Sequence, residues 1–323
     1  MIKLNRALLR LGQALHARAY RFTCVTPLTQ QRVNARPENA WAQDLAGVFG
    51  WSRPFRQATV GEELLGLMDS AGVLLAAPEG GWRSAVRWSS LNDELYVHSC
   101  HPTLHSDAVF FGPDTYRFAQ AIEQHLRQRA PQQIGRALDI GCGAGPGGLL
   151  VAHACPAAEV LAADINPLAL EYTEVNARLA GIGNLRALRS DLLGAVSGQF
   201  DLILSNPPYM LDPQGRLYRD GGGELGAGLA LAIIDQALPR LTPGGSLLLY
   251  TGVAMVGGRD LLLEHCKNAL AGQNLSWSYR EMDPDVFGEQ LLEPGYEAVE
   301  RIAAVVLTVT RGRAGEGGPG KIT

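Results

Sequence analysis

The sequence is poor in cysteine and has no long hydrophobic run. Its 323 residues include five cysteines, which are scattered and never spaced as a Cys-x-x-Cys pair. An odd number without paired spacing argues against a disulfide framework and favours a reducing compartment. No apolar run reaches the roughly eighteen residues that a membrane-spanning helix needs, and no secretory signal with a clear cleavage site is recognisable. We therefore expect a cytoplasmic protein that does not contact membranes.

The chain also lacks a strong excess of charge of either sign. Its formal net charge is −4, which excludes a polycation built to bind nucleic acid over its whole surface. Hydrophobic residues make up 46% of the chain, which is ample for a core. The length suggests one large domain and one smaller one.

Acidic residues are absent from residues 1–37, and this stretch is strongly basic. Its leucines recur at helical spacing, which predicts an amphipathic helix. Three interpretations stay open: a helix docked on the body with its arginines in solvent, a basic arm that touches RNA or the ribosome, and a mitochondrial-type presequence. The basic residues are Lys3, Arg6, Arg10, Arg18, Arg21, Arg32 and Arg36, and the leucines are Leu4, Leu8, Leu11 and Leu15.

Residues 38–106 are predicted to form a small α+β domain that begins with two helices. Asn39 is a candidate cap for a helix that runs through Phe49. Thr59 is a candidate cap for a second helix, which Gly72 would end.

A hairpin is predicted to follow these helices, which completes the outline of a winged helix. Two apolar, β-prone runs at 73–77 and 82–88 flank a Pro-Glu-Gly-Gly turn. Arg83 and Arg87 are expected on the wing, where they can contact phosphate or an acidic protein. A protein-facing or purely structural domain is the alternative, because the segment also carries the acidic residues Glu62, Glu63, Asp69, Glu79, Asp93 and Glu94.

Three histidines and a cysteine then fall within eight residues, at His98, Cys100, His101 and His105. These side chains are possible zinc ligands, but their spacing matches no usual zinc-finger or zincin pattern, and no second ligand pair stands downstream. We therefore predict no metal site and expect this segment to link the two domains near the active site.

From residue 107 to 311 the sequence alternates strand-like and helix-like segments. Such alternation predicts an α/β domain with a mostly parallel, doubly wound sheet. The segment 212–228 is glycine-rich and is expected to be mobile, either as a lid or substrate loop or as a merely flexible loop. Residues 312–323 are predicted to be a flexible tail. The expected strands are 136–140, 160–163, 184–189, 200–205 and 246–250, with 275–281 and 302–310 as an antiparallel closing pair.

A glycine-rich turn comes directly after the first of these strands. Gly141, Gly143 and Gly145 let the backbone turn sharply and approach a ligand without Cβ clashes. Asp164 ends the next strand, where a carboxylate can accept hydrogen bonds from both hydroxyls of a ribose. Nicotinamide-dependent dehydrogenases use a similar pattern, so these residues predict an adenosine-containing cofactor without choosing its class.

The fourth strand ends in the tetrapeptide Asn206-Pro207-Pro208-Tyr209. Each proline fixes its own φ and restricts the preceding residue to extended geometry, so the turn is stiff. The Asn206 amide, a neighbouring carbonyl and the flat face of Tyr209 together suit a planar NH2 group, such as an amide or the exocyclic amine of a base. A turn that only stops the strand is the alternative.

With the glycine turn, the strand-end acids and this tetrapeptide in sequence order, the chain resembles the class I S-adenosylmethionine-dependent methyltransferases. Within them it looks like the small-methyltransferase, HemK-like branch with an NPPY motif. The resemblance covers roughly residues 107–310. It implies a Rossmann-like sheet of seven strands with an antiparallel closing strand, and S-adenosylmethionine as the cofactor.

The resemblance also implies roles for individual residues. Asp139 is expected to meet the methionine ammonium of the cofactor, directly or through water. Asp191 would take the adenine N6 amine, and the N–H of Leu192 would meet N1. Asn206, Pro207, Pro208 and Tyr209 would be catalytic. The full set expected to bind the cofactor is Phe111, Thr115, Tyr116, Asp139, Gly141, Cys142, Gly143, Gly145, Asp164, Ile165, Asp191, Leu192 and Asn206.

The substrate that this resemblance favours is a protein glutamine, methylated at N5 in a release factor or ribosomal protein. An RNA adenine-N6 or guanine-N2 methyltransferase is the second interpretation, because such enzymes use the same tetrapeptide. A non-catalytic, cofactor-binding module for RNA or ribosome assembly and a nicotinamide dehydrogenase are the remaining alternatives. The sequence contains no signal for an oligomeric state.

Overall fold

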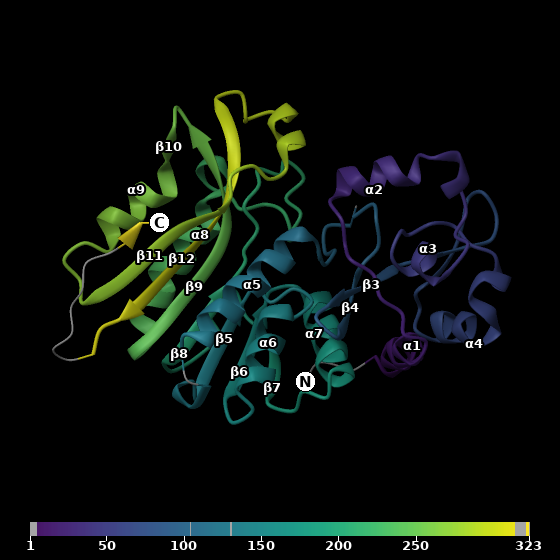
Figure 1. The fold of residues 1–323 in the computed structure, drawn as a ribbon, viewed down its shortest axis with the longest axis horizontal. Coiled ribbons are helices and arrows are strands. Elements are labelled where there is room, and N and C mark those ends of the chain that lie inside the picture. The colour runs from purple at the N-terminus through teal and green to yellow at the C-terminus, as the bar shows by residue number, and fades with distance from the viewer. Residues whose placement is uncertain (1–4, 104, 130, 314–320, 323) are drawn as a thin grey trace. The chain divides into compact units, whose positions relative to one another are not determined.

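The computed structural model describes residues 5–103, 105–129, 131–313 and 321–322 (Figure 1). The chain divides into two compact units. The first contains the described residues up to Tyr116 together with Gly143–Pro146 and Asn166–Gly183, and the second contains the rest. Leu4 and most of the predicted tail lie outside the described residues. None of the described helices is long and apolar enough to cross a membrane.

One sheet, whose strands lie in the order β13-β11-β12-β9-β8-β5-β6-β7, forms the centre of the second unit. The five strands β5 to β9 are all parallel to one another. Strand β12 is antiparallel to both β9 and β11. The strands are β5 (Arg136–Ile140), β6 (Glu159–Asp164), β7 (Leu185–Arg189), β8 (Phe200–Ser205), β9 (Leu241–Val256), β10 (Arg259–Asp260), β11 (Leu275–Asp283), β12 (Val299–Arg311) and β13 (Lys321–Ile322).

This sheet confirms the predicted fold class. Its seven longer strands in the described chain are the predicted ones, with five parallel strands and an antiparallel pair formed by β11 and β12. Two short strands were not predicted: β10 pairs with β9, and β13 pairs with β11. Each of them is only two residues long, which leaves too little pattern for a sequence-based prediction.

Helices cover the sheet because its strands are apolar on both faces. Leu247 and Leu249 of β9 belong to a core cluster that also contains residues of α8 (Gly228–Ala237) and α9 (Leu261–Ala269). Tyr250 points to the opposite face, since side chains alternate along a strand. Its ring centroid lies 6.2 Å from that of Phe118 in α5 (Pro113–Arg127). Helix α6 (Pro146–Ala154) follows β5.

The first unit is helical at its start and continues with two hairpins. In α1, Leu8, Leu11 and Leu15 are all buried, so the predicted leucine stripe is a packed helix face, at least from Leu8 onward. Hairpins β1–β2 and β3–β4 are antiparallel. The elements are α1 (Arg6–Ala17), α2 (Pro27–Asn34), α3 (Leu45–Phe49), α4 (Gln57–Ser70), β1 (Leu74–Ala76), β2 (Trp82–Ser84), β3 (Val86–Leu91), β4 (Glu94–Ser99) and α7 (Pro167–Leu179).

Two predicted helix caps in this unit are wrong. Asp44, and not Asn39, caps α3, because its carboxylate accepts a hydrogen bond from the Gly47 N–H at 2.7 Å. The assigned helix α4 starts at Gln57, before Thr59, and is interrupted at Gly61, whose φ of 78° is non-helical. The predicted end at Gly72 and the hairpin formed by β1 and β2 are confirmed.

The prediction that Arg87 lies on an exposed wing is also wrong. Arg87 belongs to β3, in a second hairpin that was not predicted, and is only 4% exposed. Its Nε donates to the Gly50 carbonyl at 2.9 Å, and its Nη2 donates to Cys24 Sγ at 3.1 Å. The winged-helix description of this unit stays a prediction.

The histidine-rich segment starts inside the same hairpin, whose strand β4 ends at Ser99, and its expected role as a link between the domains stays a prediction. His98 lies in β4, is fully buried, and its Nε2 hydrogen-bonds Ser89 Oγ at 2.8 Å. Burial lowers the pKa of His98 well below its ordinary value, because the charged imidazolium loses its hydration. Among the described residues, no group of three or more histidine, cysteine or acidic side chains is arranged to hold a metal ion.

Candidate active site

The carboxyl ends of four parallel strands lie next to one another in the second unit. In the strand register, Ile140 at the end of β5 pairs with Ala163 of β6 and with Ser205 of β8. Asp164, the last residue of β6, pairs with Arg189 of β7. Since ligands of open α/β sheets bind outside the carboxyl ends of the strands, this edge is the candidate active site.

Asp139 supports this edge from inside the sheet. Its side chain is 2% exposed, and one carboxylate oxygen accepts a hydrogen bond from the Gly148 N–H at 2.7 Å. A Cβ on Gly147 would come within 2.8 Å of the same carboxylate, so a glycine is needed there. Burial raises the pKa of Asp139 to about 7, and the negative charge of Asp164 adds to this effect. The contact with a cofactor ammonium stays a prediction.

The glycine-rich turn is anchored by its first two residues. The N–H groups of Gly141 and Cys142 both donate to the Ala163 carbonyl, at 2.8 and 3.1 Å. Gly141 has a φ of 67°, which L side chains rarely adopt, and no atom lies within 4 Å of the place where a Cβ would be. The turn therefore presents bare backbone to open space, as a close-fitting ligand requires.

The remainder of the turn belongs to the first unit, where α7 holds it. Thr173 Oγ1 donates to the carbonyl of Gly143 at 3.0 Å. Asn176 is fully buried and its amide donates to the carbonyls of Ala144, at 2.8 Å, and Val97. Its Oδ1 also accepts a hydrogen bond from the Val97 N–H. Gly145, which was predicted together with Gly143, also has a positive φ.

Phe111, Thr115 and Tyr116 contribute to the packing of the first unit. Phe111 is fully buried and stacks on the imidazole of His98, with ring centroids 5.1 Å apart. Thr115 Oγ1 accepts a hydrogen bond from the Gly112 N–H at 3.2 Å. The Tyr116 hydroxyl accepts one from the Cys24 N–H at 2.8 Å. Their predicted role in covering the cofactor stays a prediction.

The ends of β6 and β7 carry the next predicted residues. The half-buried Asp164 is followed by Ile165, which is 44% exposed, although isoleucine is usually buried. Asp191 is exposed, and Leu192 has a φ of 45°, which costs a non-glycine residue of order 1–3 kcal/mol. Ser190 supports this backbone, because its hydroxyl donates to the Leu192 carbonyl at 2.8 Å.

The Asn206 turn starts directly at the end of β8. Ser205 is fully buried, and its hydroxyl donates to the Ile140 carbonyl at 2.8 Å, which ties β8 to the strand that leads into the glycine turn. Asn206 is half-buried, and its side-chain amide hydrogen-bonds no other group within the described part of the chain. Its acceptor and donors are thus available to a ligand.

Tyr209 is more enclosed than its predicted role suggests. Its side chain is 8% exposed, and its ring centroid lies 6.4 Å from that of Phe287. A Cβ on Gly252 in β9 would come within 2.1 Å of the Tyr209 ring. One part of the ring therefore rests on the bare backbone of β9. Stacking on a substrate stays a prediction that requires another part of the ring to be uncovered.

The glycine-rich segment after Tyr209 is held by backbone hydrogen bonds at both of its ends. The Met210 N–H donates to the Arg219 carbonyl at 3.1 Å, and the Gly221 N–H donates to the Met210 carbonyl at 2.8 Å. The Leu229 N–H donates a hydrogen bond to the Gly221 carbonyl at 2.8 Å. The expected mobility of this segment and its role as a lid or substrate loop stay predictions.

Sequence reasoning missed the residues that support this site, namely Ser190, Ser205, Asn176 and Tyr296, whose hydroxyl accepts a hydrogen bond from the Leu211 N–H. Ser205 stands next to the tetrapeptide, so its position at a buried strand end was a usable signal. Asn176 and Tyr296 lie far along the chain from the groups they bind, so no local pattern indicates them.

The arrangement as a whole fits an adenosine-containing cofactor with a charged methionine end. The bare glycine turn leaves room for a close-fitting ligand, and acids stand at the ends of β5, β6 and β7. Exposed Ile165 next to Asp164 offers an apolar surface to a base. Together with the strand order, these features define the class of Rossmann-like, S-adenosylmethionine-dependent methyltransferases.

Comparison with known proteins identifies the family within this class. The methyltransferase small domain family matches residues 104–269, and the chain belongs to this family. It is an enzyme that uses S-adenosylmethionine as methyl donor. The predicted family, cofactor and enzyme class are confirmed. The dehydrogenase alternative and the non-catalytic alternative are set aside.

Three relatives illustrate the range of similar proteins. The release factor glutamine methyltransferase of Deinococcus radiodurans is 33% identical over 212 residues, 58% of this chain and 74% of that protein. The protein of the same name from Salmonella typhimurium is 37% identical over 154 residues, 43% and 53% of the two chains. Ribosomal RNA small subunit methyltransferase C of Actinobacillus succinogenes is 35% identical over 176 residues, 54% and 46% of the two chains. The chain thus spans about half the length of the last two.

Proposed function

We propose that this enzyme methylates the side-chain amide nitrogen of a glutamine in a protein, and that the Asn206–Tyr209 turn binds that amide. The target NH2 would donate one hydrogen bond to Asn206 Oδ1 and one to the Pro207 carbonyl. Two such bonds fix the orientation of the target NH2 group. They also turn the nitrogen lone pair out of conjugation with the amide carbonyl. Positioning of this kind is the main contribution a protein makes when the cofactor carries the reactive group.

S-adenosylmethionine, when bound, supplies a methyl group on a positively charged sulfur. The target nitrogen becomes acidic once it is methylated, so it loses its proton without a strong base. Asp139, Asp164 and Asp191 are proposed to hold the ammonium, the ribose hydroxyls and the adenine amine, in that order. The backbone of Gly141 would approach the methionine end.

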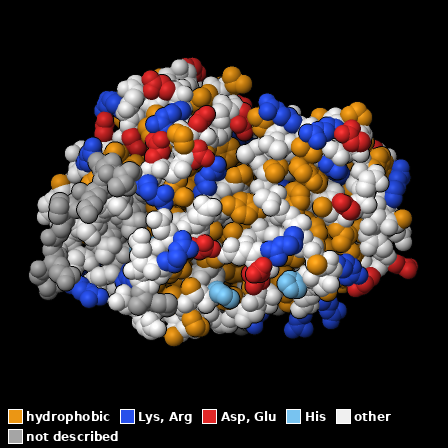
Figure 2. Space-filling model, in the orientation of Figure 1, with side chains coloured by type: hydrophobic (Ala, Val, Ile, Leu, Met, Phe, Trp, Pro, Cys, Tyr) orange, Lys and Arg blue, Asp and Glu red, His pale blue; other side chains and the backbone are white. Residues whose placement is uncertain are grey.

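The choice between protein and RNA rests on the charge next to the turn. The segment 284–298 between β11 and β12, called the β11–β12 excursion, contains four acidic residues and no lysine or arginine. All four are exposed, and acidic side chains, with some arginine and lysine among them, are visible over the second unit in Figure 2. The four residues are Asp285, Glu289, Glu293 and Glu297.

Contacts attach this acidic excursion to the segment directly after the turn. Tyr296 bonds the backbone of Leu211, and Gln290 bonds Arg219. Carboxylates at this place repel a phosphate backbone, which dominates the affinity of most nucleic-acid complexes. Leu292 is 89% exposed between Glu289 and Glu293, and it suits a protein partner with apolar and basic contacts. The names of the Deinococcus and Salmonella relatives point the same way.

An RNA substrate is the second candidate, and the Actinobacillus relative is the observation that favours it. The arginines of the first unit support it less. Arg18 pairs with Glu63 and Arg21 pairs with Asp93, so part of the basic stretch is neutralised within the unit. An RNA base would use the same Asn206 turn for its exocyclic amine.

The deciding experiment labels an extract from cells that lack this enzyme, using the purified protein and radiolabelled S-adenosylmethionine. One half of the product is treated with protease and the other with RNase. We expect the label to be lost with protease, and mass spectrometry of the labelled protein to show a methylated glutamine. Loss of label with RNase alone would overturn the proposed substrate in favour of a base.

A further inference from the structure

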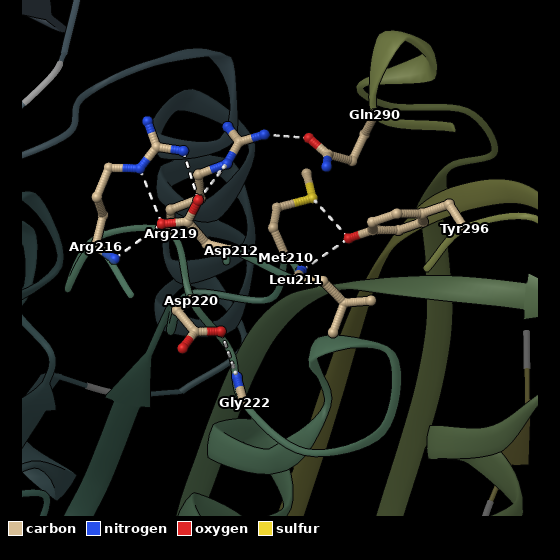
Figure 3. A network of polar contacts seen from close by, with 9 residues as sticks. All are labelled: Met210, Leu211, Asp212, Arg216, Arg219, Asp220, Gly222, Gln290 and Tyr296. Atoms are coloured by element: carbon tan, nitrogen blue, oxygen red, sulfur yellow. Dashed lines mark hydrogen bonds and ion pairs between the residues drawn. The ribbon is translucent and has the colours of Figure 1, made fainter. Parts of the chain in front are cut away.

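Three side chains of the β11–β12 excursion contact the Asn206–Tyr209 turn or the segment 210–219 that follows it. Phe287 lies beside the Tyr209 ring. Gln290 accepts a hydrogen bond from the Arg219 guanidinium, and Tyr296 reaches the Met210–Leu211 backbone (Figure 3). The excursion is more than 60 residues away along the chain, so these contacts are purely tertiary.

We propose that Tyr296 is a positioning residue that holds the Asn206–Tyr209 turn in its working geometry, assisted by Gln290. This inference rests on the proposed role of the turn, and it does not depend on whether the substrate is protein or RNA. Tyr296 touches neither substrate nor cofactor in this scheme. It acts through the peptide units directly after Tyr209.

The hydroxyl of Tyr296 uses both its acceptor and its donor on this segment. It accepts a hydrogen bond from the Leu211 N–H at 2.9 Å and donates to Met210 Sδ at 3.7 Å. The side chain is fully buried, so neither contact competes with water. A tyrosine hydroxyl is protonated at neutral pH, and burial raises the pKa of Tyr296 further above its ordinary value.

A second anchor fixes the other side of Met210. Its N–H and carbonyl bond the backbone of Arg219 and Gly221. The Arg219 guanidinium lies 3.9 Å from the carboxylate of Asp212, and it also donates to Gln290. Asp212 itself accepts hydrogen bonds from the backbone and the guanidinium of Arg216 (Figure 3). Both polar groups of the Met210 backbone are therefore satisfied.

The two prolines couple the position of Met210 to the position of Asn206. Pro207 and Pro208 have fixed φ angles, so few rotations between Met210 and Asn206 are left to absorb a shift, and the turn moves largely as a body. A misplacement of about 1 Å at a reacting group can cost about 10²-fold in rate. Loss of the Tyr296 hydroxyl should therefore lower turnover and leave cofactor binding, at the other strand ends, unchanged.

The test uses the full chain and Tyr296→Phe, which removes one oxygen from a buried ring. On the substrate that the wild type methylates, we expect kcat to fall about tenfold, with the Kd for S-adenosylmethionine unchanged. The matched control is Tyr279→Phe. Tyr279 is also buried, and its hydroxyl bonds Asp260 at the cap of α9 and not the turn. We expect this control to lose stability and to retain kcat.

A kcat for Tyr296→Phe equal to that of the wild type, or equal losses in Tyr296→Phe and Tyr279→Phe, would overturn the inference. Gln290→Met is the second variant, and it should lower kcat in the same way by releasing Arg219. Failure of the proposed substrate is a separate outcome, since the wild type would then label RNA. The comparison of variants would be repeated on that RNA.

Discussion

Asn206 is held by the backbone around it and not by bonds of its own side chain. On one side, the hydroxyl of Ser205, the residue before Asn206, donates a hydrogen bond to β5. On the other side, Pro207 and Pro208 restrict the backbone. The amide is therefore both positioned and available. A group with these two properties can bind more strongly in the transition state than in the ground state, which is the requirement for raising kcat.

We predict that Asn206→Ala lowers kcat by about 10²–10³-fold, the usual cost of one transition-state hydrogen-bonding group. The Kd for S-adenosylmethionine, measured by calorimetry, should stay the same. Asn206→Asp keeps the acceptor oxygen and should retain more activity than Asn206→Ala. An alanine variant as active as the wild type would remove Asn206 from the mechanism.

Asp139 leads to a prediction about pH. Its pKa is raised to about 7 by burial, so the carboxyl is largely protonated below that pH when no cofactor is bound. If the cofactor ammonium pairs with it, binding requires the ionised form. The affinity for S-adenosylmethionine should then rise with pH up to about 7, by at most about tenfold per pH unit, and level off above.

Calorimetry between pH 5.5 and 7 in buffers of different ionisation enthalpy tests this prediction, because binding should release a proton. The Asp139→Asn variant should bind more weakly and without this pH dependence. A wild-type Kd that is the same over this range would mean that Asp139 only supports the glycine turn through Gly148.

At the scale of the element, strand β9 contacts the Tyr209 ring through one residue, Gly252. Gly252 lets the strand pass directly under the Tyr209 ring, since a Cβ would approach the ring to within 2.1 Å. We predict that Gly252→Ala shifts the ring, lowers kcat and costs about 1–3 kcal/mol of stability, the usual range for overpacking.

Gly66→Ala in α4 is the matched control, because no atom lies within 4 Å of its Cβ position. The control should be as active as the wild type, and it should be slightly more stable because alanine favours a helix.

Kinetics and thermal unfolding of both variants check this prediction. Unchanged kcat in Gly252→Ala would show that the position of the Tyr209 ring is unimportant for turnover.

The β11–β12 excursion is the second element that affects the site. It carries positioning contacts on its inner side and exposed carboxylates on its outer side. In the proposed scheme, one segment thus holds the Asn206–Tyr209 turn and presents charge to the substrate. The same carboxylates would be a disadvantage in an enzyme whose substrate is a polyanion.

At the scale of the whole molecule, the proposed protein substrate leads to a prediction about electrostatics. The net charge of −4 and the acidic excursion create a negative field next to the site. We predict that the double variant Glu289→Lys and Glu293→Lys raises KM for the protein substrate several-fold and leaves kcat unchanged. The difference should shrink as salt is added, because exposed charges are screened.

The matched control for this variant is Glu62→Lys with Asp69→Lys. Both acids are exposed on α4 of the first unit, and the charge change is the same. Steady-state kinetics at low and high salt should show a raised KM only in the excursion variant. An unchanged KM there would remove the excursion from substrate binding.

Local features of the sequence determined the fold class and the candidate site edge. The alternation of apolar strands and helices, the glycines after β5, the acids at strand ends and the Asn206 tetrapeptide are each readable within a few consecutive residues. In a parallel sheet each strand end is brought to the same edge, so local patterns are enough to assemble the site.

The tertiary structure alone decided which residues support that edge. Arg87 has the sequence appearance of an exposed charge and is buried by contacts with Gly50 and Cys24. Asn176 bonds Ala144 and Tyr296 bonds Leu211, over separations of 32 and 85 residues. Single buried hydrogen bonds between distant residues have no periodicity, so a sequence alone cannot indicate them. Only the packing of the folded chain determines which buried polar groups form hydrogen bonds with each other.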